Sequence, residues 1–145
     1  MRVKRPKDLY YSEAHLWLKL EEKNEVVLGV TDYLIRNMET INSIKLPKAK
    51  TEIEQDAFFC EIDTDEGLTT LISPVSGKIL NVNNYLLKNH QLLLEDNYDE
   101  GWLMRIKLSD PAEVEILISH DEYNEFVESE LAEADESENE EEETE

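Results

Sequence analysis

Four carboxylates fall within six residues of the chain: Glu61, Asp63, Asp65 and Glu66. Such a cluster raises the question of a cation site, because Ca²⁺ takes oxygen ligands. The calcium loop of an EF-hand has glycine at its sixth position and glutamate at its twelfth. With Glu61 in first place, glycine comes one position late and isoleucine takes the twelfth, so the segment does not match. We interpret it as a charged, exposed turn and predict no metal site.

Side chains that act in nucleophilic or acid–base catalysis are scattered along the sequence. Cys60 follows an alanine and two phenylalanines and has no histidine near it, which favours a small buried strand residue over a reactive thiol. His15, His90 and His120 lie far apart in the sequence, and the four glycines form no phosphate-binding loop. We therefore predict no catalytic residues and expect that the protein is not an enzyme.

The acidic cluster belongs to a predicted β-hairpin. Residues 61–82 have the pattern of two short strands about a turn at Gly67, followed by a third strand after the breaker SPVSG at 73–77. A solvent-exposed hairpin tip is a natural contact surface. The candidate interaction surface consists of Asp63, Asp65, Glu66 and Gly67.

The elements around this hairpin are also mostly strands. Apolar and polar residues alternate over 16–28, which predicts a second hairpin, and further strands are expected at 41–46 and 101–108. Thr31 and Asp32 can cap a helix of about two turns, Asp110 and Pro111 begin another, and residues 92–94 are expected in a buried loop. The pattern indicates a mainly-β domain.

Motifs in these elements resemble the lipoyl-carrier H protein of the glycine cleavage system. The similarity covers residues 9–127 in order and with nearly the family's spacing. It rests on Tyr11, His15 and Trp17 and on the segments GVTDY (29–33), SPVSG (73–77), EDNY (95–98) and IKLSDP (106–111). The resemblance implies a lipoyl-domain-like barrel or sandwich of two antiparallel sheets, with short peripheral helices and a C-terminal helix.

The chain departs from the family at the residue that carries the cofactor. In the family, a lysine eight residues before the proline of SPVSG bears lipoate in amide linkage, and counting back from Pro74 gives Glu66. No lysine occurs between Lys50 and Lys78, so a small shift of the alignment does not supply one. A carboxylate cannot take the place of the amine nucleophile that the linkage requires. We therefore expect no lipoate and no other cofactor.

The charge of the chain limits its partners. The 145 residues carry a net charge of −21, which disfavours nucleic acid and anionic membranes and favours a protein partner. No apolar run has the length of a membrane span, and the amino terminus lacks the apolar segment of a signal peptide. We expect a cytoplasmic protein of one domain.

The two ends of the chain differ from the domain in their charge composition. Residues 1–8 form a basic segment, either a solvated terminus or a docking signal. In residues 128–145, 11 of 18 side chains are acidic and none is basic. Such a segment buries too little apolar surface to offset the entropy of ordering, so we predict an acidic disordered tail.

Three functional hypotheses follow from the resemblance and the departure from it. In the first, a non-lipoylated H-like module binds a protein partner, such as a glycine-cleavage or lipoate-processing enzyme. In the second, the protein is a true carrier that shuttles an aminomethyl group on lipoate attached to a non-standard lysine, with Lys78 nearest. In the third, the acidic tail gives the protein a chaperone-like binding activity. The missing hairpin lysine favours the first hypothesis.

Overall fold

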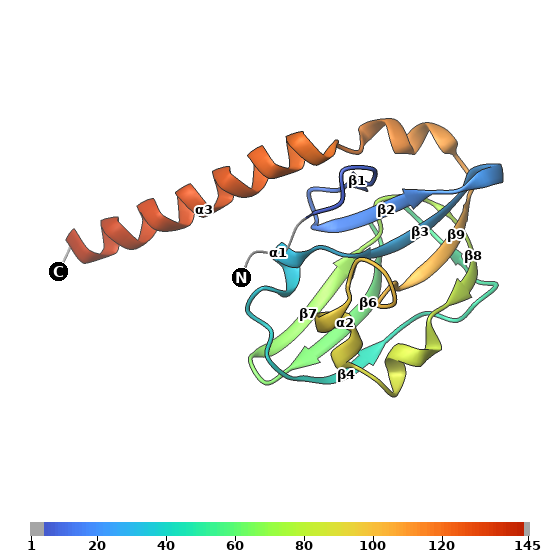
Figure 1. Ribbon diagram of the computed structural model, residues 1–145, viewed down its shortest axis with the longest axis horizontal. Helices are drawn as coiled ribbons and strands as arrows, with labels where there is room; N and C mark the ends of the chain where they lie inside the picture. The colour runs from blue at the N-terminus through green and yellow to red at the C-terminus, as the bar shows by residue number, and fades with distance from the viewer. Residues whose placement is uncertain (1–4, 144–145) are drawn as a thin grey trace.

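Two antiparallel sheets build the protein (Figure 1). The computed structural model describes the backbone of residues 5–143 and the side chains of residues 5–132. The six-stranded sheet has the order β1-β2-β3-β9-β8-β5 and the three-stranded sheet the order β4-β6-β7. The strands are β1 (Tyr10–Tyr11), β2 (Leu16–Leu20), β3 (Glu25–Val30), β4 (Ile41–Lys45), β5 (Glu52–Ile53), β6 (Phe58–Thr64), β7 (Gly67–Ile72), β8 (Gly77–Val82) and β9 (Met104–Leu108). The predicted mainly-β architecture of two antiparallel sheets is confirmed.

Alternation of side chains fixes the register of the larger sheet. Leu18 of β2 lies opposite Leu28 of β3, and both side chains are fully buried. A shift by one residue would turn these side chains to the solvent, which makes the observed register strongly preferred. The predicted hairpin over residues 16–28 is thus confirmed.

Short helices connect the strands. Thr31 caps α1 (Asp32–Ile35) by accepting a hydrogen bond from the backbone N–H of Leu34, but α1 spans four residues rather than the two turns expected. Residues 92–94 lie in a helix and not in a loop, because the buried Leu93 anchors the turn and leucine favours helix. The other short helices are η1 (Glu22–Asn24), η2 (Asn84–Leu87), α2 (Gln91–Glu95) and η3 (Pro111–Ile116).

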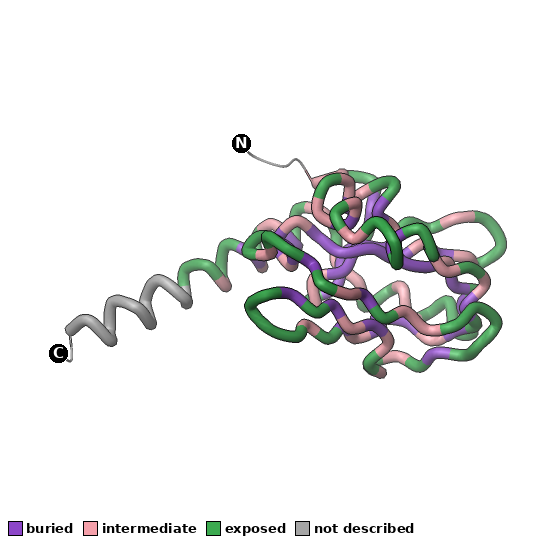
Figure 2. The backbone as a smooth tube through the Cα atoms, turned by 90° about the horizontal axis from the view of Figure 1, so that it is seen from below, coloured by how far each residue is buried: buried purple, intermediate pink, exposed green. Residues whose placement is uncertain are grey.

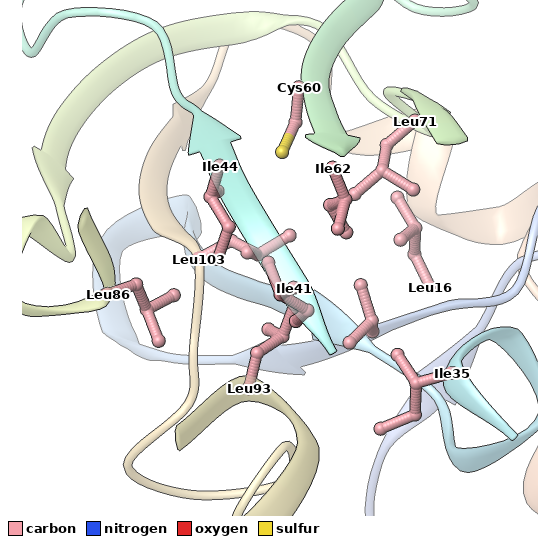
Figure 3. Packing of buried hydrophobic residues seen from close by; sticks show 11 residues of the cluster. Leu16, Ile35, Ile41, Ile44, Cys60, Ile62, Leu71, Leu86, Leu93 and Leu103 are labelled. Carbon is pink, nitrogen blue, oxygen red and sulfur yellow. The ribbon is translucent and has the colours of Figure 1, made fainter. Parts of the chain in front are cut away.

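The hydrophobic core fills the space between the sheets. Figure 2 shows the buried backbone in the interior and exposed backbone in the connections. One core cluster takes Leu16 from the larger sheet, Ile62 and Leu71 from the smaller sheet, and Leu86 and Leu93 from the short helices (Figure 3). Residues distant in sequence therefore hold the sheet that contains β6 and β7 against the rest of the domain.

Helix α3 (His120–Glu143) ends the described chain and projects from the domain (Figure 1). Its first turns pack on the domain, where the Tyr123 ring stacks on Tyr11 with centroids 4.7 Å apart. The helix differs from the expected disorder over residues 128–145, because glutamate, alanine and leucine favour helix and Glu130 contacts His15 in the domain. Residues 144–145 of the expected tail and residues 1–4 of the basic segment lie outside the described residues.

Candidate functional site

The β6–β7 hairpin closes on a two-residue turn. Thr64 pairs with Gly67, which leaves Asp65 and Glu66 between the strands. The hydroxyl of Thr64 donates to the carbonyl oxygen of Gly67 at 3.1 Å and accepts from the backbone N–H of Glu66 at 3.2 Å. Gly67 has φ 134°, a conformation that L-residues rarely adopt. Local sequence thus defines both the position and the shape of the tip.

Side chains of the predicted interaction surface lie together on this tip. Asp63, Asp65, Glu66 and Gly67 are all exposed, whereas Ile62 is fully buried, as the alternation along the strand requires. The side-chain amide of Asn42 in β4 donates to the Asp65 carboxylate at 3.0 Å. The hairpin therefore presents a compact acidic surface that is fixed to the neighbouring strand.

A metal site does not form among the described side chains. Within the part of the chain that the structure describes, no group of three or more His, Cys, Asp or Glu side chains is arranged to hold an ion. Glu61 instead contacts Lys45 of the adjacent strand, with 3.7 Å between Nζ and Oε2. Lys45 is the last residue of strand β4, within the strand expected over residues 41–46.

The hairpin tip contains no lysine. Lys78 lies in β8, opposite Lys107 of β9 and Glu52 of β5, in the sheet that does not contain the hairpin. The tip itself holds Glu66, whose carboxylate cannot form the amide that lipoate requires. The tip residues therefore do not fit covalent attachment of that cofactor.

Cys60 and the three histidines do not assemble into a catalytic group. The Cys60 side chain is buried in the core, and burial raises its pKa to about 12, as expected for an inert structural thiol. His90 contacts the carbonyl oxygen of Leu87, and His120 contacts Asp121. His15 lies between β1 and β2, His90 precedes α2 and His120 begins α3, and each histidine has its own structural partner.

Sequence analysis missed two polar networks that attach the ends of the chain to the domain. The imidazole of His15 lies 2.8 Å from the Tyr123 hydroxyl through Nδ1 and 2.9 Å from Glu130 through Nε2. Arg5 donates to both carboxylate oxygens of Asp32 at 2.8 and 3.1 Å, and the Tyr98 hydroxyl also donates to Asp32. These partners are 27 to 115 residues apart, so no local pattern could reveal them.

Tyrosines contribute to both networks. Tyr11 is fully buried, and its hydroxyl donates to the carbonyl oxygen of Pro6. Burial raises the pKa values of Tyr11, Tyr98 and Tyr123, so all three hydroxyls stay protonated at neutral pH. The cluster is a neutral, hydrogen-bonded anchor for the termini.

Two apolar side chains near the hairpin are exposed and were not singled out from the sequence. Leu68, the residue that follows the tip, is 59% exposed, and Phe58 at the start of β6 is 70% exposed. The predicted hairpin over residues 61–82 includes Leu68 and begins after Phe58, and the strand pattern did not show that either side chain would be exposed. Among residues 5–143, no helix combines the length and apolar character needed to cross a membrane.

Comparison with known proteins places these features in a family. The family model described as "Glycine cleavage H-protein" matches residues 9–130. A glycine cleavage system H protein of Carboxydothermus hydrogenoformans is 34% identical over 125 residues, which cover 86% of this chain and 95% of that protein. The corresponding protein of Halalkalibacterium halodurans is 35% identical over 125 residues, covering 86% of this chain and 97% of the relative.

A solved structure supports the same fold. The crystal structure of a glycine cleavage system H protein from Mycobacterium marinum superposes with a TM-score of 0.75 and 22% sequence identity. It covers 82% of this chain and 95% of the other. The family match includes the acidic hairpin and the first turns of α3. The chain therefore belongs to the glycine cleavage H-protein family.

Proposed function

We propose that this protein is a non-lipoylated member of its family that acts by binding another protein. The observation behind the proposal is Glu66 at the tip of the β6–β7 turn, where the family resemblance implies a lipoyl-lysine. A carboxylate leaves the carrier fold without its attachment group. The surface formed by Asp63, Asp65, Glu66 and Gly67 then serves as part of a docking face and not as the base of a swinging arm.

The charge of the protein supports a basic protein surface as the partner. A net charge of −21 disfavours nucleic acid and anionic membranes and speeds the encounter with a positively charged protein. Enzymes of glycine cleavage or of lipoate processing are candidate partners, because the chain belongs to the glycine cleavage H-protein family. We place this interaction in the cytoplasm.

The alternative lysines are poorly placed for a carrier. Lys78 lies on β8, which pairs with β9 and with the edge strand β5 in the sheet that does not contain the hairpin, so an attached arm would begin away from the hairpin tip. Lys45 lies next to β6, but its ammonium group faces Glu61. Carriage on one of these lysines, and binding through the acidic segment 128–145, are the competing functions that experiments must separate.

Intact-mass measurement of the protein purified from its native cells tests the proposal. We expect the unmodified mass, and peptide mapping of residues 60–78 should show no adduct. A lipoyl adduct on any lysine would replace the proposal with carrier function.

A matched pair of variants then tests whether a lipoate ligase still recognises the hairpin tip. Glu66→Lys restores an amine at the tip, whereas Asp63→Lys places the same charge on the strand three residues away. After exposure to a lipoate ligase, we expect an adduct on the Glu66→Lys protein and none on the Asp63→Lys protein. Removal of residues 128–145 should leave binding of a purified partner intact, and loss of all binding would favour the tail hypothesis.

A further inference from the structure

Strand β7 (Gly67–Ile72) forms an edge of the three-stranded sheet. It pairs with β6 on one side. Within the described chain, no strand pairs with its other side, and its backbone makes no other backbone hydrogen bond. In an antiparallel strand, alternate residues direct their N–H and C=O groups away from the partner strand. Strand β7 therefore has backbone donors and acceptors available for another strand.

The sequence of β7 lacks the features that normally protect an edge. Edge strands are usually short, charged, interrupted by proline or covered by another element. The six residues of β7, GLTTLI, contain no charge and no proline. The opposite edge, β4, carries Lys45 and packs against η2, and the edges of the larger sheet, β1 and β5, are two residues long. Among these edges, β7 is the long one without a protective feature.

The outer face of β7 combines apolar contact with negative charge. Leu68 is 59% exposed and lies opposite Asp63, while exposed Thr70 lies opposite Glu61. Asp65 and Glu66 stand at the open end of the strand. A segment that paired with β7 would thus meet one apolar side chain. Its long basic side chains would extend across β7 toward the carboxylates of β6, which lie about 9.6 Å away because adjacent strands are about 4.8 Å apart.

We propose that β7 accepts an extended, lysine- or arginine-containing segment of a partner protein as an additional strand. The backbone of β7 supplies the hydrogen bonds, and the tip carboxylates select for positive charge. A second copy of the chain is the less suitable occupant, because each copy carries a net charge of −21 and would bring its own acidic tip. This inference rests on the proposed function and specifies its mode of binding.

Short synthetic peptides test this mode with the full chain. The probe alternates lysine and valine, and two controls replace lysine with glutamate or carry N-methyl groups on alternate residues at unchanged charge. Titration calorimetry measures affinity, and amide hydrogen exchange locates the bound probe. We expect protection of β7 amides and about tenfold weaker binding of the N-methylated peptide, because it cannot complete the hydrogen-bond ladder.

A charge-matched pair of variants locates the contact. Thr70→Lys adds a lysine to the exposed face of β7, and Asn81→Lys makes the same change at an exposed position of β8 in the other sheet. We expect the first variant to weaken binding of the lysine–valine peptide about tenfold and the second by no more than about twofold. Circular dichroism and thermal unfolding would verify that both variants are folded.

Four results would overturn the inference. The N-methylated peptide could bind as tightly as the lysine–valine peptide, or the bound probe could protect amides only outside β7. The Thr70→Lys and Asn81→Lys variants could lose the same affinity, or the probe could fail to bind even at low salt. A dimer of the chain alone that protects β7 would identify a second copy as the occupant. These outcomes are independent of the intact mass, so an unmodified protein that fails to bind the peptide keeps the proposed function and loses this mode of binding.

Discussion

Trp17 occupies the space that a side chain at position 29 would need. The two residues are cross-strand partners in β2 and β3, and a Cβ atom on Gly29 would lie 2.2 Å from the Trp17 ring. The indole cannot move aside freely, because its Nε1–H donates to the carbonyl oxygen of Asn97 at 2.9 Å. Contact with the Trp17 ring therefore explains why glycine begins the GVTDY motif at residues 29–33.

We predict that Gly29→Ala lowers the free energy of unfolding by about 1–3 kcal/mol, the usual range for overpacking a core. Urea unfolding followed by tryptophan fluorescence measures the change. In a Trp17→Ala background the ring is absent, so the added methyl group should cost less than about 0.5 kcal/mol. An equal cost in both backgrounds would show that the backbone, and not the indole, excludes alanine.

The pH dependence of stability should contain a contribution from His15. Burial is the main influence on this imidazole and lowers its pKa from the ordinary value of 6.5, while the nearby charge of Glu130 opposes the change. Below pH 6.5 the unfolded chain therefore binds more protons at this site than the folded chain. The stability that the neutral imidazole provides is complete above pH 6.5 and is lost as the pH falls through the lowered pKa.

His15→Asn tests this contribution, because His15 has φ 69° and asparagine tolerates that conformation well. The unfolding free energies of the original protein and of the variant are compared between pH 5 and pH 8. The contributions of the carboxylates that both proteins share then cancel. We predict a smaller loss on acidification in the variant. Parallel curves would mean that His15 does not titrate differently in the folded and unfolded chains.

Sequence patterns predicted the parts of the fold that depend on neighbours in the chain. Alternation predicted the β2–β3 hairpin, and strand-forming residues about the turn at Gly67 predicted the β6–β7 hairpin. Thr31 and Asp110 were recognised as helix caps from their types alone. The acidic composition of residues 128–145 predicted a disordered tail, whereas the backbone of residues 128–143 is helical and rich in glutamate, which favours helix. Burial of Leu93, which turns the expected loop into α2, depends on strands that are remote in sequence.

The acidic tip was predicted from the sequence, but its surroundings were not. Turn chemistry at Gly67 placed Asp65 and Glu66 correctly. The contact between Asp65 and Asn42 and the open edge of β7 depend on strand order, which no local pattern contains. Sequence patterns therefore located Glu66 at the turn, whereas the shape of the surface around it depends on the three-dimensional fold.

Glu130 should belong to the folded domain, and this places the end of the domain beyond residue 127. Its carboxylate contacts the His15 imidazole at 2.9 Å, and both side chains are partly buried. We predict that a chain ending at Ala132 keeps the full unfolding free energy, whereas a chain ending at Ser129 loses up to about 1 kcal/mol. Glu130→Gln in the longer chain should show a similar loss, and an unchanged stability would return the boundary to residue 127.

Asp32 should be a major attachment point for the residues before β1. It accepts from Arg5 and from the Tyr98 hydroxyl, and it is partly buried. We predict that Asp32→Asn lowers the unfolding free energy by about 1–3 kcal/mol, because the Arg5 charge loses its carboxylate partner. Asp8→Asn removes the same charge at an exposed position and should change stability by less than about 0.5 kcal/mol. Comparable losses in the two variants would indicate an effect of net charge.

Cys60 should react with thiol reagents only when the protein unfolds. Its side chain is buried among residues of both sheets, and its pKa of about 12 leaves roughly one molecule in ten thousand as thiolate at pH 8. We predict that iodoacetamide labels the native protein in proportion to its unfolded fraction, and that urea above the unfolding midpoint restores ordinary reactivity. Labelling without denaturant that is faster than the unfolded fraction multiplied by the rate of the unfolded chain would instead show direct access to the thiol. Gly29→Ala provides the internal comparison, because a destabilised core should label faster in proportion to its larger unfolded fraction.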